Sequence, residues 1–228
     1  MGTLTYLQMT NRVVAKITQA EISDVTAATG QAKMITNFLN EAQSSLGMDD
    51  WYTLLTTRTV ATVASTATVA FASDFARGLD VTDTTSGRVL VEDTVRTFDL
   101  IDRGQGNTGT PTHMGYLGTA YIFHPTPAAV LSLRDRYWKI PTPMAANGDF
   151  SSFPDFCDNI IMYYAEWNIL EYLHEVDKAD RARIRMEREL KSAKTANRKV
   201  INQMHVMRDV TPTRNRIGPL LPTSFGIR

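Results

Sequence analysis

The sequence predicts a mainly helical α+β protein: an antiparallel helical bundle with a small antiparallel β insertion and an extended C-terminal arm. Apolar residues recur at helical spacing towards both ends of the chain, and a stretch rich in Thr and Val separates them. Prolines interrupt the final stretch, which therefore cannot continue as a regular helix. We expect residues 1–52 and 141–200 to form the bundle, residues 53–140 the insertion, and residues 201–228 the arm.

Two helices are expected in the N-terminal part, over residues 4–21 and 31–46. In the second helix, Phe38 belongs to a set of apolar residues at helical spacing, and Gly47 follows as a stop signal. Trp51 comes shortly afterwards. We predict that Phe38 lies in the helical core and that Trp51 closes it.

The middle of the chain has a β pattern. Residues 56–71 alternate weakly, and Ser65-Thr66 is expected to turn between two strands. Residues 92–100 are expected to form one or two helical turns. Residues 104–118 contain five glycines, which indicates a long surface loop or a hairpin tip. The other strand candidates are residues 79–81, 88–90, 119–123 and 130–138.

The chain is organised around a helix predicted over residues 156–174, because no other segment offers as much aromatic and aliphatic area. Pro154 suits the first turn of this helix, where no amide donor is needed. His174 stands at the end of the apolar face and is interpreted as a partly buried core histidine. Spacings of four and three residues define the face predicted to enter the core, which consists of Phe156, Ile160, Tyr163, Trp167 and Leu170.

A further helix is expected over residues 177–199, with dense charge and only a thin stripe of small apolar residues. Such a stripe suits a helix at the rim of the protein or between subunits. Residues 208–228 contain three prolines yet remain apolar, so we interpret them as an extended arm that binds another surface.

Charge is distributed unevenly along the chain, although its formal net charge is 0. From Arg181 onward, 12 Lys and Arg residues stand against 3 Asp and Glu residues, which leaves 12 against 21 in residues 1–180. Opposite poles in a neutral chain favour ordered self-assembly or a docking tail. The alternative is a solvated helix face followed by a loose terminus.

The sequence predicts no enzyme and no cofactor or metal site. The GQGNTG segment at residues 104–109 lacks the last glycine of a dinucleotide fingerprint, and the four histidines lie in four different segments. Cys157 is the only cysteine, so no disulfide within one chain is possible; its apolar surroundings predict an inert buried thiol. Apolar runs are too short to span a bilayer, and no secretory signal is present. We therefore expect a soluble protein, made in the cytoplasm, that has no membrane partner.

Several segments in a fixed order resemble a known family. They are Phe38-Leu39-Asn40-Glu41-Ala42-Gln43 followed by Asp50-Trp51, the Thr-rich strands running into Asp74-Phe75, Ile122-Phe123-His124-Pro125-Thr126-Pro127 leading into Leu131-Ser132-Leu133 and Tyr137-Trp138, and Phe153-Pro154-Asp155-Phe156. Together they are similar to the phage head–tail adaptor family, the head-completion proteins beneath the portal ring. The resemblance covers residues 31–199.

The resemblance implies a structural virion protein at the head–tail interface. Subunits of this family form a ring, commonly of twelve copies, that docks on the portal protein, extends the DNA channel and meets a tail or nozzle protein below. It implies transient, non-specific contact with DNA in the channel. On the basic helix, we expect a lumen or subunit interface that includes Arg181, Arg185, Arg188 and Lys191. The arm interpreted from composition falls where the family places its portal-binding element, and we expect its contacts to be Arg208, Arg214, Arg216, Ile217, Leu220, Leu221, Phe225 and Ile227.

A nucleic-acid-binding module is the alternative function, with the basic helix over residues 181–199 as its binding surface. This reading predicts that the purified monomer binds duplex DNA with a steep dependence on salt. Aromatic residues are not interleaved with these basic residues, and the whole chain is neutral, which favours the adaptor.

Overall fold

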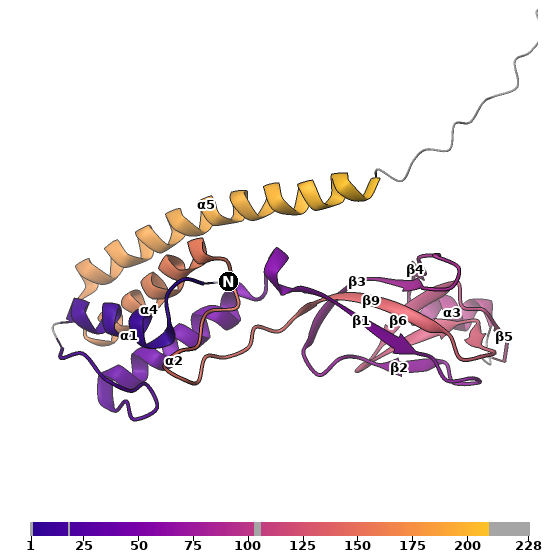
Figure 1. The fold of residues 1–228 in the computed structure, drawn as a ribbon, viewed down its shortest axis with the longest axis horizontal. Coiled ribbons are helices and arrows are strands. Elements are labelled where there is room, and N and C mark those ends of the chain that lie inside the picture. Colours follow the sequence, from indigo (N-terminus) through magenta and orange to yellow (C-terminus); the bar gives the residue numbers. More distant parts are fainter. Residues whose placement is uncertain (1, 18, 103–105, 210–228) are drawn as a thin grey trace, which may run out of the picture.

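Two bodies lie end to end in the computed structural model, which describes residues 2–17, 19–102 and 106–209, with side chains through residue 201 (Figure 1). The helical body consists of α1 (Tyr6–Val14), η1 (Ala15–Ile17), α2 (Gly30–Leu46), η3 (Asp155–Cys157), α4 (Asp158–Tyr172) and α5 (Val176–Asp209). The short helix η2 (Tyr52–Leu54) leads from it into the β body, which spans residues 55–139.

Helix α4 is the centre of the helical body. Its residues Ile161, Ala165 and Ile169 are fully buried, at a spacing of four that keeps them on one face. The same core includes Met9 of α1 and Leu39 of α2. The three helices therefore bury a shared apolar interior, as the sequence predicts for a bundle.

Trp51 closes this core between α2 and the start of α4. Its indole N–H donates a hydrogen bond to the carbonyl oxygen of Leu46 at 2.8 Å, and its ring meets Phe153 edge-on at a centroid distance of 5.8 Å. The buried Asp158 carboxylate accepts hydrogen bonds from the backbone N–H groups of Thr3 and Leu4, at 2.8 and 3.1 Å. The N-terminus is thereby tied to the beginning of α4.

The residues predicted for the core differ in depth. Trp51, Ile160 and Leu170 are buried. Those that are half-buried are Phe38, Phe156, Tyr163 and Trp167. The most deeply buried face of α4 is therefore rotated away from the aromatic residues of the predicted face.

The interpretation of His174 as a core residue is wrong. Helix α4 ends at Tyr172, and His174 lies in the turn before α5, where it is exposed and has a φ of 59°. The predicted face assumed that the helix continues to this position. Since it does not, the side chain leaves the apolar stripe.

Gly47 ends α2 and also permits a close approach of two segments. Its N–H donates to the carbonyl oxygen of Gln43 at 2.9 Å. A Cβ placed there would lie 2.5 Å from the ring of Pro141, where the chain returns from the β body. Only glycine fits against this proline, so the end of α2 and the exit from the β body pack together.

The β body holds strands that pair in three groups. The first sheet has the order β1 (Leu55–Ala61), β9 (Ser132–Lys139), β3 (Phe75–Asp83) and is antiparallel. The second has the order β2 (Thr68–Ala70), β7 (Ala120–His124), β6 (His113–Leu117), β4 (Val91–Glu92). β5 (Thr108–Gly109) pairs with β8 (Thr126–Pro127), and α3 (Val95–Ile101) lies beside β6. Both larger sheets enclose an apolar core that includes Tyr121, Phe123 and Leu133.

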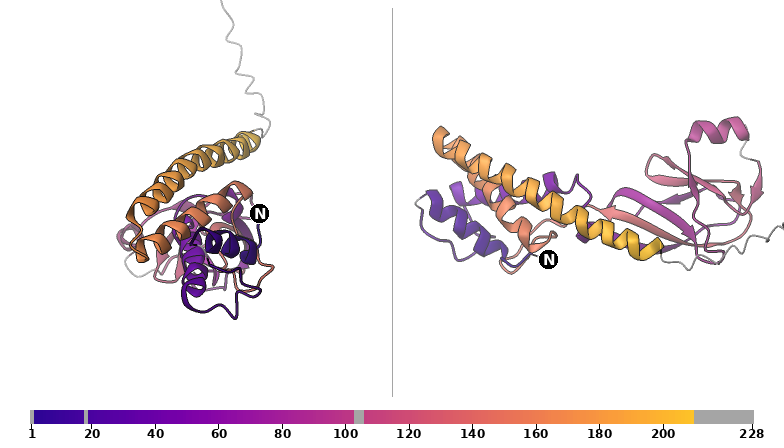
Figure 2. Two further views of the ribbon diagram at one scale, coloured as in Figure 1. Left: turned by 90° about the vertical axis from the view of Figure 1, so that its left-hand side faces the viewer. Right: turned by 90° about the horizontal axis from the view of Figure 1, so that it is seen from above.

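The prediction of a mainly helical bundle is wrong. Helix accounts for 42% and strand for 23% of the structure, with three sheets in its described part, so the fold is α+β. The β body is as substantial as the helical body (Figures 1 and 2). Strands of up to nine residues give a weaker periodic signal than long helices do.

One detail of the β prediction differs from the structure, and another agrees with it. Residues 56–71 do not form a hairpin, because β1 pairs with β9 and β2 pairs with β7. Within residues 104–118, β6 forms a hairpin with β7, and Gly118 occupies its turn with a φ of 59°. Thr and Val content indicates a strand, but it does not specify the partner strand.

The arm predicted over residues 201–228 begins in a helix. Helix α5 continues to Asp209, so residues 201–209 are helical rather than extended. No proline or glycine interrupts the chain before that point, which explains why the helix continues. Residues 210–228 lie outside the described part of the chain.

Candidate interaction surfaces

Helix α5 lies along α4 through a narrow contact made by small residues. Ala179 and Ala182 are buried against Leu170 of α4. Further along, Ala193 is buried in the main core, where Met186 and Leu190 also pack. Because the contacting side chains are small, the helices approach closely and most of the circumference of α5 stays available to solvent (Figure 1).

A buried asparagine fixes α5 to the segment that enters the β body. The side chain of Asn197 donates to the carbonyl oxygen of Asp50 at 2.6 Å and accepts from the N–H of Tyr52 at 3.1 Å. Lys194 pairs with Asp49 at 2.8 Å, and Arg77 of β3 pairs with Asp50. These contacts gather α5, the end of the helical body and β3 around one short segment.

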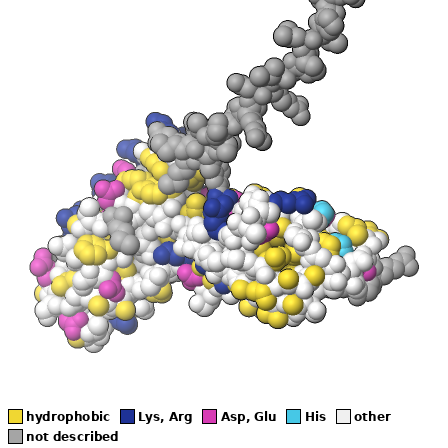
Figure 3. All heavy atoms as spheres, turned by 45° about the vertical axis from the view of Figure 1, so that its right-hand side comes forward, with side chains coloured by type: hydrophobic (Ala, Val, Ile, Leu, Met, Phe, Trp, Pro, Cys, Tyr) yellow, Lys and Arg dark blue, Asp and Glu magenta, His cyan; other side chains and the backbone are white. Residues whose placement is uncertain are grey.

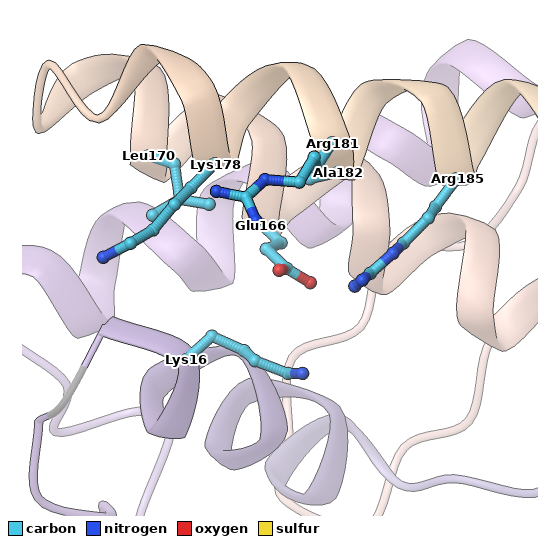
Figure 4. Close-up of a pocket in the computed structure, with 7 residues that line it drawn as sticks. All are labelled: Lys16, Glu166, Leu170, Lys178, Arg181, Ala182 and Arg185. Carbon is cyan, nitrogen blue, oxygen red and sulfur yellow. The ribbon is translucent and has the colours of Figure 1, made fainter.

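Basic side chains converge on a pocket between η1, α4 and α5 (Figure 4). The pocket has a volume of about 220 Å³ and is open to solvent. Its lining residues are Lys16, Glu166, Leu170, Lys178, Arg181, Ala182 and Arg185. Figure 4 shows the carboxylate of Glu166 pointing from α4 into the space between Lys16 below and the arginines of α5 above.

Glu166 is unusual in this pocket, because it is an acidic residue that is only 9% exposed. Among the described residues, neither an ion pair nor a hydrogen bond joins its carboxylate to another side chain. Lys178 pairs instead with Glu175 at 2.8 Å, and the Nε–H of Arg181 donates to the carbonyl oxygen of Asp177 at 3.0 Å. The cations thus surround the buried carboxylate without closing onto it.

An apolar groove lies where the two bodies meet. It has a volume of about 440 Å³, and its lining includes Met48, Trp138, Ile140 and Pro141. The guanidinium group of Arg77 stacks over the Trp138 ring at 4.8 Å. Met48 is 81% exposed at its edge.

Large apolar side chains are also exposed on the β body. Leu100 of α3 is 71% exposed, and Val130 is 66% exposed. Figure 3 shows hydrophobic side chains gathered on one face of this body. An exposed apolar surface of this kind is typical of proteins that bind other proteins.

A family model described as the SU10 adaptor protein matches residues 4–216 of this chain. The match covers both bodies and all of α5. The chain belongs to this family of phage head–tail adaptors. The search of curated proteins found no match to this chain.

Membership of the SU10 adaptor family assigns the chain a structural role in joining phage components, as a part of the virion. In the described part of the adaptor, no group of three or more His, Cys, Asp or Glu side chains is placed to hold a metal ion. Cys157 is fully buried, and burial raises the pKa of its thiol to about 12. No described helix is both long and apolar enough to cross a membrane.

The four basic residues predicted for a lumen or subunit interface all lie on α5. Arg181, Arg185, Arg188 and Lys191 are all exposed on α5. Arg181 and Arg185 line the pocket, whereas Arg188 and Lys191 do not belong to its lining.

The residues predicted to bind the portal lie almost entirely beyond the described chain. Arg208 falls in the last turn of α5, and nothing is described of its side chain. The others, which are Arg214, Arg216, Ile217, Leu220, Leu221, Phe225 and Ile227, lie outside the described residues.

Sequence reasoning missed the pocket of the adaptor. Lys16 lies some 150 positions from Glu166, so only the fold brings the two together. One signal was available: Glu166 stands between Ala165 and Trp167 in the most apolar helix of the chain. A carboxylate in such a helix requires a partner or a polar cavity.

Proposed function

We propose that the protein forms a ring beneath the portal, extends the DNA channel, and joins head to tail, with its C-terminal arm docked on the portal. Membership of the adaptor family supports the joining role. The structure of α5, the composition of the arm and the distribution of charge support the ring and the portal contact.

The direction of α5 supports portal docking by the arm. The helix has 34 residues, which corresponds to about 50 Å at 1.5 Å per residue. It starts on α4, and its C-terminal end extends past the end of that helix (Figures 1 and 2). Helix α5 thus ends away from the core of the helical body.

The composition of the last residues suits binding to another protein. Three prolines keep the segment from forming a regular helix, and the apolar residues between and after them include Leu220, Leu221 and Phe225. Apolar anchors on an extended segment bind by filling pockets or by adding to a sheet edge. A ring presents many arms at once, so weak single contacts add to strong attachment.

The uneven charge supports the ring. Residues 181–228 carry 12 Lys and Arg against 3 acidic residues, while the rest of the chain has an excess of acidic residues. In a ring, neighbouring subunits meet through two different surfaces, and opposite charges on these surfaces favour that pairing over other orientations.

Contact with DNA is proposed to be transient and non-specific. Arg188 and Lys191 remain exposed on α5, but the chain as a whole is neutral. A channel through which DNA moves requires weak contacts, and phosphate contacts of this kind weaken as salt rises. We expect no sequence preference.

Removal of the arm tests the proposed portal contact. A protein ending at Asp209 is expected to keep its unfolding midpoint, since α5 is complete, and to lose portal binding by about 100-fold or more. Binding is measured by surface plasmon resonance on immobilised portal rings from the same phage. As a matched control, Arg214→Ala with Arg216→Ala keeps every apolar anchor and is expected to weaken binding less than Leu221→Ser with Phe225→Ser. Undiminished binding of the truncated protein would contradict the proposal.

A further inference from the structure

The basic pocket of the helical body has an unmatched charge. Lys16, Arg181 and Arg185 take part in no ion pair within the described chain, and they face a single carboxylate, that of Glu166. Lys178 stands at the rim with its own partner, Glu175. Three cations and one carboxylate leave a local excess of positive charge around a cavity of about 220 Å³.

The volume of the pocket limits the size of the group that it can bind. The cations come from η1 and α5, and they lie around the carboxylate of Glu166 (Figure 4). A cavity of this volume accepts one small charged group rather than a chain of them. Guanidinium groups bind a carboxylate in a planar, bidentate manner, so two arginines on one helix face are well suited to such a group.

We propose that this pocket receives the carboxylate of an Asp or Glu side chain from a second copy of the protein. The inference rests on the proposed ring, and it names the surface through which neighbouring copies meet. Residues 1–180 carry 21 Asp and Glu residues against 12 Lys and Arg residues, so a second copy offers an excess of the required group. In this proposal, the positive charges of Lys16, Arg181 and Arg185 are shared between two carboxylates, the incoming one and that of Glu166.

A phosphodiester of DNA fits this pocket less well. Duplex DNA presents a row of phosphates and requires cations spread along an exposed surface. Arg181 and Arg185 instead line a recess, and they share it with the buried negative charge of Glu166. Arg188 and Lys191, which do not line the pocket, are the residues on this helix that a passing duplex would meet.

Two double variants distinguish a specific role of the pocket arginines from the general effect of lowering the positive charge of α5. Arg181→Ala with Arg185→Ala removes two pocket cations, and the control, Arg188→Ala with Lys191→Ala, removes the same charge from the same helix. All four residues are exposed, so we expect both variants to fold. The dissociation constant of self-association, measured by analytical ultracentrifugation, is expected to rise about 30-fold for the pocket pair and about twofold for the control. Equal effects, or no effect of the pocket pair, would overturn the proposal.

Cross-linking identifies the group that enters the pocket. A carbodiimide joins a lysine amine directly to a carboxylate in contact with it. Full-length chains labelled with ¹⁴N and ¹⁵N are mixed, cross-linked and digested, and mixed-isotope products are sought by mass spectrometry. We expect Lys16 or Lys178 to be joined to an Asp or Glu of the other isotope. Products confined to one isotope, such as Lys16 joined to Glu166 of the same chain, would contradict the inference.

Failure of this inference is distinguishable from failure of the proposed function. If wild-type chains stay monomeric at all concentrations but bind the portal, the pocket proposal is wrong and portal docking stands. If the pocket pair loses binding to duplex DNA while self-association is unchanged, the pocket is a nucleic-acid site and the proposal is likewise wrong. Loss of portal binding in the arm variants supports portal docking, and the pocket proposal is decided by the self-association measurements.

Discussion

Asp135 is a fully buried charge at the centre of the β body, and its partners bring three strands together. The Tyr121 hydroxyl of β7 donates to one carboxylate oxygen at 2.8 Å, and Nε of Arg58 donates to the other at 2.8 Å. Arg58 stands directly opposite Asp135 in the pairing of β1 with β9. Its guanidinium also donates to the carbonyl oxygen of Ala70 on β2, at 2.8 Å. Each of these polar groups would lose its hydrogen-bond partner if another were removed, which would lower the stability of the fold.

Asp135→Asn is expected to destabilise the protein by about 2–3 kcal/mol, because the charge-assisted hydrogen bonds with Tyr121 and Arg58 are lost. The matched control is Asp99→Asn, an exposed position in the same body, where we expect a change within about 0.5 kcal/mol. Urea unfolding followed by tryptophan fluorescence and circular dichroism gives both values. If the two variants prove equally stable, the assigned role of Asp135 is incorrect.

Cys157 makes stability depend on pH above neutrality. Burial, assisted by the nearby charges of Asp158 and Asp155, raises the pKa of its thiol to about 12, against about 8.5 in an unfolded chain. The folded state thus holds the proton to higher pH. The contribution of the protonated thiol to the free energy of unfolding is fully present below pH 8.5, and it is lost as the pH rises towards 12.

Between pH 8 and pH 10, wild-type protein is therefore expected to lose about 2 kcal/mol more stability than Cys157→Ala, which has no thiol to ionise. The comparison concerns the two slopes, so the cost of the substitution itself cancels. Urea unfolding at several pH values provides the measurement. Identical slopes would show that the thiol ionises in the folded protein much as it does in the unfolded chain.

At the residue scale, sequence reasoning succeeded where burial follows from local pattern. Cys157 stands at the start of an apolar helix, and its interpretation as a buried thiol agrees with the structure. The pairing of Asp135 with Arg58 could not be predicted, because it depends on the register of two strands 77 positions apart. Glu166 and Lys16 were missed for the same reason.

At the scale of elements, α5 is held in place by few but specific contacts. Small residues pack against α4 in its first half, and Asn197 anchors its second half to the carbonyl oxygen of Asp50 and the N–H of Tyr52. The anchor stands where the chain leaves the helical body for β1. The Asn197 side chain therefore helps to set the direction of the second half of α5.

Asn197→Ala is expected to cost about 1–3 kcal/mol, because two hydrogen bonds are lost and the backbone groups of Asp50 and Tyr52 lose their partner. Backbone amides of α5 beyond Lys194 should exchange faster in hydrogen–deuterium exchange, while those of α4 remain unchanged. The control is Arg198→Ala, the exposed neighbour on the same helix. Unaltered exchange in the Asn197 variant would mean that α5 is fixed by other contacts.

Helices were predicted more accurately than strands, for a physical reason. Residues 31–46 were expected to be helical, and α2 spans Gly30–Leu46, because helical periodicity and its glycine stop are both local signals. The partners of β1 and β2 are not local, so the expected hairpin was wrong. The end of α5 was misplaced because a proline marks where a helix must stop, and this one contains none through Asp209.

At the scale of the whole molecule, the two bodies are joined by the segment after α2 and by the chain leaving β9 (Figure 1). The α+β composition was underestimated because β1 and β3 pair with β9, a strand that is distant in the sequence. We propose that residues 1–52 with 141–200 and residues 53–140 are separate structural units. In this proposal, the helical unit carries the ring contacts, and the β unit offers its exposed apolar side chains to neighbouring or tail-side proteins.

The central claim is that the arm of each subunit docks on the portal while the two bodies stay folded beneath it. Electron microscopy of the purified protein mixed with portal rings of the same phage tests this most directly. We predict a ring of the protein coaxial with the portal, with density running from the end of each α5 onto the portal surface. Density for residues 210–228 folded back into the core of its own subunit, with the portal bound through other surfaces, would contradict the account.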